Sequence, residues 1–235
     1  MKLVLTSEHG GNLIPQKYRY LFKNESATLN SHKGFDKGTF DLFTYLSPIA
    51  AFSKATQTSR LLIEANRSLH HPALFSVYTN ELEHSIKNEI IEKYYAPYRN
   101  VVEEKIAEFI AEGETVFHLS VHSFTPILNG EKRTADIGIL YDSKRLEEKK
   151  LAQLFKKELN ASFQHELKIQ FNYPYLGSAD GFTTYLRKKF PKNYIGIELE
   201  MNQKFVEKKA FPSSLKKVVK IAVEKIMEVH AQELK

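Results

Sequence analysis

Apolar and polar positions along the chain follow two periods. Short, almost continuous apolar runs, which are typical of strands buried on both faces, are separated by longer stretches in which apolar residues recur at helical spacing. The runs predict strands at 1–5, 59–65, 115–121, 135–141, 167–171 and 194–200. Strands that alternate with helices indicate an α/β fold, in which helices cover a layered sheet.

Helical periodicity accounts for most of the remaining chain. Pro48 and Pro97 are expected to end or kink two of the helices, because proline lacks the backbone N–H that a helix interior needs. The segment 172–181 is rich in Asn, Pro, Gly and Asp and is expected to be a loop that forms a lid or a pocket wall. No repeat, low-complexity segment or linker interrupts the pattern, so we expect residues 1–235 to form one domain. The expected helices lie at 15–22, 39–52, 81–112, 142–158, 182–190 and 213–234.

Side chains capable of chemistry follow three of the predicted strands. His9 lies in the stretch SEHGGN after the first strand, His122 follows the strand at 115–121, and Glu200 ends the last strand. Ligands of open α/β sheets bind outside the carboxyl ends of the strands. We therefore expect these side chains to lie together at one edge of the sheet.

Several of these residues have two interpretations. His9 is either an exposed histidine in a glycine-containing turn or a metal ligand. Asp36, just before the helix at 39–52, either caps that helix or points a carboxylate into the site. His118, Ser120 and His122 share one face of their strand. A lone histidine there would most often belong to the core, whereas a pair of histidines on a strand that ends at the turn Ser-Phe-Thr-Pro favours a site.

Two further pairs indicate a site. Asn66 and Arg67 follow the predicted strand at 59–65, where an arginine can bind a carboxylate through two parallel hydrogen bonds; the alternative is a surface arginine in a turn. Glu198 and Glu200 are two residues apart and share a face of the last strand. Because an unpaired carboxylate is costly to bury, this pair favours a functional site.

Composition limits the partners and metal ligands that this chain can be expected to have. Lys plus Arg number 34 and Asp plus Glu number 28, a formal charge of +6, but many lysines lie beside glutamates in helical stretches, as on solvated helix faces. We therefore expect no nucleic-acid partner, although the positive field could attract a small anion. Without cysteine, a metal would be held by His, Asp, Glu or Asn. No apolar run is long enough to cross a bilayer and no signal-peptide pattern opens the chain, so we expect no membrane partner and a cytoplasmic location.

Five short segments resemble the N-formylglutamate amidohydrolase family in the same order. They are SEHGGNLIP, HKGFDKGT, SRLLIEANRS, HSFTP and IELEMNQKF, and they extend from Ser7 to Phe205. The family is related to zinc carboxypeptidases and aspartoacylase-like deacylases, which implies a single three-layer α/β domain with a central mixed sheet of about eight strands. The resemblance also implies hydrolysis of the amide bond of an N-acyl amino acid. The default substrate is N-formylglutamate, cleaved to formate and glutamate in bacterial histidine breakdown.

The resemblance implies one Zn²⁺ per chain. His9 and His122 match the family's two zinc-ligand histidines, and Asp36 matches the aspartate expected as the third ligand. The carboxypeptidase pattern has a Glu three residues after the first histidine, where this chain has Asn12. Asn12 and Glu8 therefore remain alternatives for the third ligand.

The resemblance also implies roles for the remaining candidates. Glu200 would be the catalytic base, with Glu198 as the alternative. Asn66 and Arg67 would hold the carboxylate of a small N-acyl amino acid, and Arg60 would stabilise the oxyanion.

One departure from the family leaves the substrate open. Many family members carry Arg two residues after the catalytic Glu, where this chain has Asn202. Another N-acyl amino acid, or a small peptide-like amide, is the alternative substrate within the same class. The alternative of a different class is a noncatalytic carboxylate-binding module on the same fold.

Overall fold

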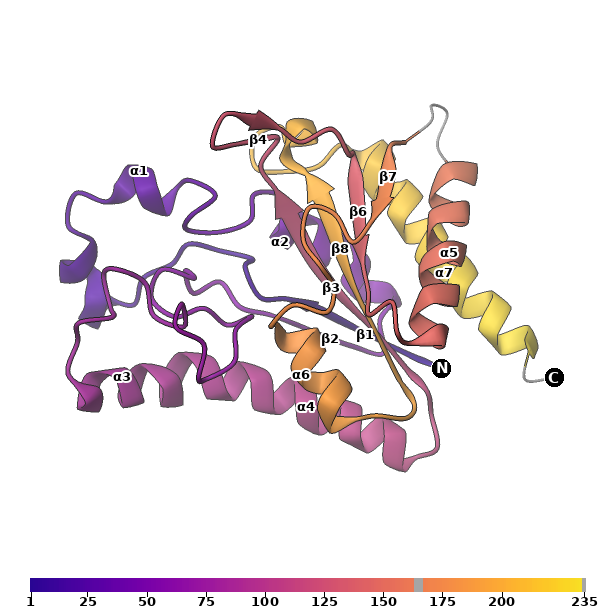
Figure 1. Ribbon diagram of the computed structural model, residues 1–235, viewed down its shortest axis with the longest axis horizontal. Coiled ribbons are helices and arrows are strands. Elements are labelled where there is room, and N and C mark those ends of the chain that lie inside the picture. The colour runs from indigo at the N-terminus through magenta and orange to yellow at the C-terminus, as the bar shows by residue number, and fades with distance from the viewer. Residues whose placement is uncertain (163–166, 234–235) are drawn as a thin grey trace.

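The computed structural model describes residues 1–162 and 167–233. Its main strands are β1 (Lys2–Ser7), β2 (Phe52–Ala55), β3 (Val116–Phe124), β6 (Ile137–Leu140), β7 (Ile169–Phe171) and β8 (Tyr194–Asn202). They form one sheet in the order β2-β1-β3-β8-β6-β7, in which only the β6–β8 pair is antiparallel (Figure 1). Two short strands, β4 (Ile127–Leu128) and β5 (Glu131–Lys132), form a separate antiparallel pair. The sheet is mixed, as expected, but has six strands in the described chain instead of about eight.

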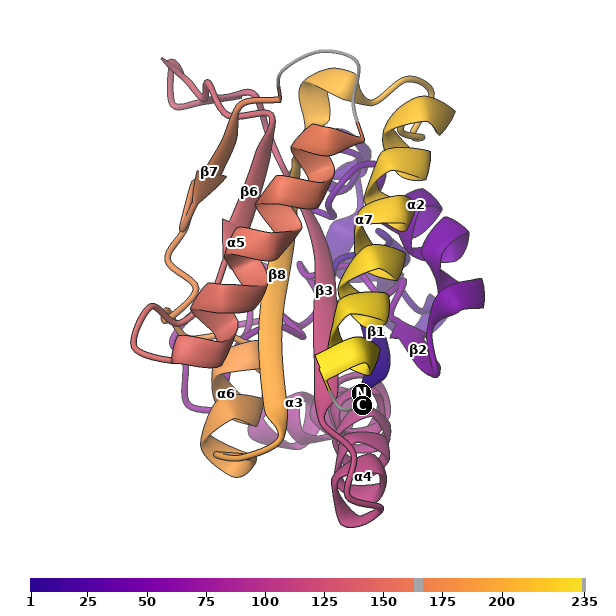
Figure 2. The same cartoon turned by 90° about the vertical axis from the view of Figure 1, so that its right-hand side faces the viewer.

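Helices cover both faces of this sheet, so the domain has three layers. One layer contains α2 (Thr39–Leu46), α5 (Leu146–Ala161) and α7 (Ser213–Glu233), and Figure 2 shows α5 and α7 in front of the sheet. The other layer contains α4 (Ala96–Ala111) and α6 (Phe182–Lys189). Side chains alternate between the two layers as a strand requires: Leu3 and Leu5 pack in the first core cluster and Val4 in the second.

A third apolar cluster lies apart from the two faces of the sheet. It is built mainly from connecting segments and includes Ile14, Tyr18, Phe22, Leu62, Ile63, Leu74, Ile90 and Tyr95. Short helices contribute to this part of the chain: Gln16–Phe22, α1 (Ser26–Leu29), α3 (His84–Ile90) and a π-helical segment at Ile91–Tyr95. Two further 3₁₀ turns, at Ser47–Ile49 and Gln203–Phe205, lie elsewhere.

The third cluster explains the one strand prediction that is wrong. Residues 59–65 form turns, not a strand, and Leu62 and Ile63 are buried in the third cluster. A short apolar run has the same pattern whether it is buried in a sheet or under a loop, so periodicity cannot separate the two. The edge strand β2 was not predicted: the helix expected at 39–52 ends at Leu46, a 3₁₀ turn follows at Ser47–Ile49, and β2 begins at Phe52, the last residue of the expected helix.

The other predicted elements are present with shifted ends. The stretch predicted at 81–112 is helical from His84 to Ala111 and passes through the π-helical segment at Ile91–Tyr95, and Pro97 is the second residue of α4, directly after that segment. Leu234, the predicted end of the last helix, lies outside the described residues. No helix in the described ranges has the length and apolar character needed to cross a bilayer.

Candidate active site

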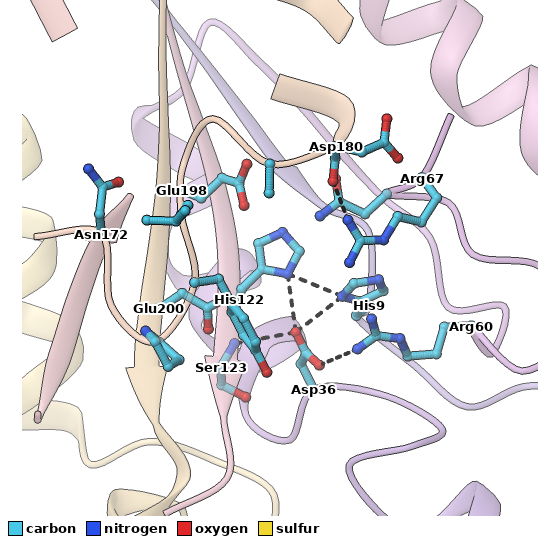
Figure 3. A pocket seen from close by; sticks show the side chains of 15 residues that line it. His9, Asp36, Arg60, Arg67, His122, Ser123, Asn172, Asp180, Glu198 and Glu200 are labelled. Atoms are coloured by element: carbon cyan, nitrogen blue, oxygen red, sulfur yellow. Dashed lines mark hydrogen bonds and ion pairs between the residues drawn. The ribbon is translucent and has the colours of Figure 1, made fainter. Parts of the chain in front are cut away.

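Parallel strands bring the predicted residues to one edge of the sheet. β3 lies between β1 and β8, so the carboxyl ends of all three strands are neighbours. His122 pairs in register with Glu200, and Ser120 pairs with Glu198. His9 follows β1 by two residues, and Figure 3 shows the side chains of His9, His122, Glu198 and Glu200 grouped around one cavity.

Three ligand atoms converge at the base of the cavity. His9 Nδ1 and His122 Nδ1 lie 3.2 Å apart, and Asp36 Oδ2 lies 3.2 Å from the first and 3.1 Å from the second (Figure 3). All three side chains are buried. Metal–ligand bonds of about 2.0 Å in a tetrahedral zinc site place neighbouring ligand atoms about 3.3 Å apart. The spacing of these three atoms therefore fits a metal ion.

Buried carboxylates hold the far side of both imidazoles. His9 Nε2 is hydrogen-bonded to Glu64 Oε1, and His122 Nε2 lies 3.0 Å from Glu8 Oε2 and 2.9 Å from Ser120 Oγ. Because a carboxylate only accepts, each Nε2 carries a proton, and each Nδ1 is the nitrogen left to present a lone pair to a metal. In the neutral imidazoles the two Nδ1 lone pairs and the Asp36 oxygen would repel one another, so positive charge, from a metal ion or from added protons, is needed between them. The donor set thus has the chemistry of a metal site.

The same neighbours set the protonation of this cluster. Burial lowers the pKa of His122, but hydrogen bonds to Asp36 and Glu8 outweigh it and raise that pKa well above its usual value. Burial and Arg60 lower the pKa of His9, and the charges of Glu64 and Asp36 reverse this and raise it. Burial raises the pKa of Glu8, yet the interactions with His122 hold it below its usual range. A metal must therefore displace protons from both imidazoles.

Asp36 is aimed into the cluster and does not cap a helix. The residue before α2 is Gly38, and Asp36 is held in place by its backbone N–H, which donates to the His9 carbonyl at 3.0 Å. The two alternative ligands lie elsewhere. Asn12 Nδ2 donates to the carbonyl of Leu29 at 3.0 Å, and the Glu8 carboxylate lies behind His122, on its Nε2 side.

The two carboxylates of β8 differ in their partners. Glu200 is buried and its Oε2 has no hydrogen-bond partner among the described residues. Burial raises the pKa of Glu200 to about 7, opposed by the charge of His122 and supported by that of Asp36. Glu198 Oε1, in contrast, accepts a hydrogen bond from the Thr183 hydroxyl. Glu200 thus has an unengaged oxygen and a pKa suited to proton transfer near neutral pH.

Arg60 lies between two carboxylates of the site. Its Nε and Nη2 bind Glu64 Oε2 at 2.7 and 2.6 Å, and its Nη1 binds Asp36 Oδ1 at 3.3 Å. The guanidinium therefore orients Asp36, the candidate third ligand, and the Glu64 carboxylate that is hydrogen-bonded to His9. Stabilisation of an oxyanion by Arg60 stays a prediction.

Asn66 and Arg67 lie on the opposite wall of the cavity. Asn66 Oδ1 accepts from the backbone N–H of Phe182 at 2.7 Å, at the start of α6. Arg67 Nη1 donates to the carbonyl of Asp180, while its Nε and Nη2 have no protein partner among the described residues. Arg67 therefore offers donors to a ligand, as the carboxylate-binding prediction requires.

The loop 172–181 forms one wall of the cavity and is anchored at both ends. Asn172 Oδ1 accepts from the backbone N–H groups of Tyr141 and Gly177, both at 3.0 Å, and Asp180 accepts from Ser68 N and Oγ at 3.0 and 2.7 Å. Gly138 permits close packing, since a Cβ there would lie 1.8 Å from the Tyr173 carbonyl oxygen. The cavity measures about 460 Å³ and is lined by His9, Asp36, Arg60, Asn66, Arg67, His122, Ser123, Asn172, Pro174, Tyr175, Leu176, Ala179, Asp180, Glu198 and Glu200.

Two supporting carboxylates were not recognised as such from the sequence. Glu64 lay in the predicted strand at 59–65, and Glu8 was considered only as a direct ligand. The available indication was that both are charged residues in largely apolar segments, where burying a charge is costly unless it is paired.

His118 belongs to the core: its nitrogens pair with Thr6 at 2.7 Å and Tyr194 at 2.6 Å, and burial lowers its pKa to about 4.

Comparison with known proteins identifies similar sequences and folds. The family model described as N-formylglutamate amidohydrolase matches residues 1–206. The crystal structure of gene product Atu2144 from Agrobacterium tumefaciens has a TM-score of 0.81 and 24% identity, over 100% of this chain and 92% of that one. The crystal structure of an N-formylglutamate amidohydrolase from Ralstonia eutropha JMP134 has a TM-score of 0.74 and 17% identity, over 99% of this chain and 95% of that one. At these identities the two structures establish the fold. A comparison with curated proteins found no match.

Proposed function

The chain belongs to the N-formylglutamate amidohydrolase family and is a hydrolase that acts on amides, and we propose that it cleaves N-acyl amino acids with the help of one bound Zn²⁺. The proposal rests on one observation above all. The ligand atoms of His9, Asp36 and His122 converge beside Glu200, whose Oε2 is buried and unpaired, at the base of a cavity. This combination provides a metal site and a proton acceptor at the same place.

His9, Asp36 and His122 would hold the metal ion. Zn²⁺ in such a three-ligand site supplies Lewis acidity, which makes water a nucleophile near neutral pH and polarises a carbonyl group. Glu8 and Glu64 keep both imidazoles in the tautomer and orientation that such an ion needs.

The remaining residues handle the substrate and the proton. Arg67 binds the free carboxylate through its unengaged Nε and Nη2, and Asn66 adds a hydrogen bond, so the scissile amide is held near Glu200. Glu200 accepts a proton from the attacking water at Oε2 and returns it to the nitrogen of the leaving amine. The products are a carboxylic acid and an amino acid.

The family name indicates N-formylglutamate as the first substrate to test, with formate and glutamate as products. The same resemblance supports a place in histidine breakdown and a cytoplasmic location, which we include in the proposal. One zinc ion per chain and one N-acyl amino acid are the expected ligands.

The test compares zinc-loaded and metal-stripped protein. Amine release from N-formylglutamate and other N-acyl amino acids is measured before chelation, after chelation, and after zinc is returned. We expect turnover that is lost on chelation and recovered with zinc. Carboxylate binding without turnover in zinc-loaded protein would instead support the noncatalytic binding module.

A further inference from the structure

The cavity offers donors to a ligand carboxylate at one arginine. Arg67 has Nε and Nη2 free among the described residues, whereas all three guanidinium nitrogens of Arg60 are engaged by Glu64 and Asp36. The described lining contains no lysine and no third arginine. A substrate with one carboxylate finds a partner there, and a second carboxylate does not.

The wall formed by the loop is apolar and exposed. Leu176 is 65% exposed and Tyr175 is 49% exposed, and Pro174 and Ala179 line the cavity beside them. Large apolar side chains that face a cavity indicate a surface that a ligand covers. The loop backbone is anchored at Asn172 and Asp180, so this wall is preformed.

An acidic group adds to the selectivity. Glu198 lines the same cavity as Arg67 and Glu200, and Figure 3 shows it above Glu200 on the side opposite Arg67; the proposed chemistry leaves it unused. Its carboxylate would repel a second negative charge on the substrate. A carboxylate held against the apolar wall would also give up part of its hydration without gaining a partner, so a dicarboxylate is disfavoured twice.

We propose that this site selects N-acyl amino acids that carry a single carboxylate and an apolar, uncharged side chain, and that it disfavours dicarboxylates such as N-formylglutamate. The inference rests on the proposed hydrolysis of N-acyl amino acids, and it replaces the default substrate N-formylglutamate, and with it the place in histidine breakdown, by this narrower substrate class. Arg67 takes the α-carboxylate, the amide faces Glu200, and the side chain lies against Pro174, Tyr175 and Leu176.

Arg133 is the competing site for a second carboxylate. Its Nη2 donates to the Tyr175 hydroxyl at 3.3 Å, its guanidinium lies 5.2 Å from the Tyr175 ring centre and 5.8 Å from that of Phe124, and its buried Nη1 has no partner among the described residues. Arg133 does not line the cavity, however. We therefore place it outside the substrate site and include it in the test.

The experiment measures kcat/KM of the zinc-loaded protein for N-formyl-methionine, N-formyl-leucine, N-formyl-glutamine and N-formyl-glutamate. Glutamine and glutamate have the same shape and differ in charge, so this pair isolates the second carboxylate. We expect N-formyl-glutamine to exceed N-formyl-glutamate by about tenfold or more, and the two apolar substrates to exceed both. Equal or better turnover of N-formyl-glutamate would overturn the inference.

Charge variants locate the selectivity. Leu176→Arg should raise kcat/KM for N-formyl-glutamate relative to N-formyl-glutamine by about tenfold. Leu146→Arg adds the same charge at a leucine that is 58% exposed and lies outside the cavity. It should leave kcat/KM for both N-formyl-glutamate and N-formyl-glutamine unchanged. A preference for N-formyl-glutamate that Arg133→Gln removes would overturn the inference and assign the second carboxylate to Arg133.

Failure of the proposed function has a separate signature. If zinc-loaded protein cleaves none of the four compounds, the proposed hydrolysis of N-acyl amino acids is wrong, and the selectivity is then tested by measuring the binding of the same compounds by calorimetry. Tighter binding of N-formyl-methionine and N-formyl-glutamine than of N-formyl-glutamate would support the proposed selectivity for a single carboxylate. The reverse order of affinities would overturn that selectivity.

Discussion

Two sides of one cavity are built in opposite ways. At the base, His9, His122 and Asp36 are buried, and each touches another buried charge such as Glu8 or Glu64. At the wall 172–181, exposed apolar side chains project from a backbone that hydrogen bonds anchor. The proposed chemistry depends on the base, where hydrogen bonds and ion pairs between buried groups fix the position of each side chain. The proposed selectivity depends on the wall, where exposed side chains can be substituted without disturbing the fold.

The largest effect is expected at the proton acceptor. Glu200→Gln should lower kcat by about 10²–10⁴, because general acid–base catalysis contributes that much. Metal content should be unchanged, since Glu200 is not among the three converging donors. Glu198→Gln is the matched variant on the same strand face and should lower kcat far less with N-formyl-methionine as substrate. A larger loss in Glu198→Gln would transfer the role to that residue.

The carboxylates behind the imidazoles should control metal affinity. Glu8→Gln and Glu64→Gln keep side-chain size but remove the charge that holds His122 and His9, and should each weaken zinc binding by about 10–100-fold. Competition with a chromophoric chelator measures this, and circular dichroism checks that the variants fold. The control is Glu104→Gln at an exposed position. Unchanged affinity in both buried variants would contradict the assigned support.

Substrate binding should weaken without loss of chemistry when the free guanidinium is removed. Arg67→Gln loses charge-assisted hydrogen bonds worth about 1.5–3 kcal/mol, so KM should rise about tenfold to a hundredfold while kcat changes little. Steady-state kinetics separate the two parameters. A fall in kcat at unchanged KM would mean that Arg67 acts in the transition state instead.

Protons and zinc should replace each other at the base. The pKa values of His9 and His122 are raised by neighbouring carboxylates, so their protonated forms stabilise the metal-free fold below pH 6.5, and this stability is lost as pH rises through the raised values. Free zinc at about 100 times Kd adds about 2.7 kcal/mol, or roughly 5–10 °C in Tm, at pH 8. At pH 6 the same zinc should raise Tm less. An equal or larger rise at pH 6 would contradict this competition.

The smallest effect is expected at the loop anchor. Asn172→Ala removes two hydrogen bonds to backbone N–H groups, each worth about 0.5–1.5 kcal/mol. Thermal denaturation should show a lower Tm, and KM should rise a few-fold because the wall is less ordered, while zinc affinity stays unchanged. A loss of zinc affinity would show that the order of the wall and the geometry of the metal site depend on each other.

The contrast between base and wall also explains what the sequence could predict. Strands β1, β3 and β8 are long apolar runs that end in polar residues, so their positions and the meeting of His9, His122 and Glu200 at one edge follow from pattern alone. The pairing of His9 with Glu64 spans 55 residues and depends on how residues 59–65 turn, which local pattern does not determine. His118 and His122 have the same sequence signature and differ only in the partners that the fold supplies.

The central claim is that His9, Asp36 and His122 bind zinc, and metal content tests it most directly. Elemental analysis compares the native chain, His122→Ala, and His118→Gln as a matched control on the same strand. We predict about one zinc per native chain, as a three-ligand site implies, retained in His118→Gln and lost in His122→Ala. No zinc in the native chain after zinc is supplied at neutral pH would contradict the account and leave a carboxylate-binding cavity on a hydrolase fold.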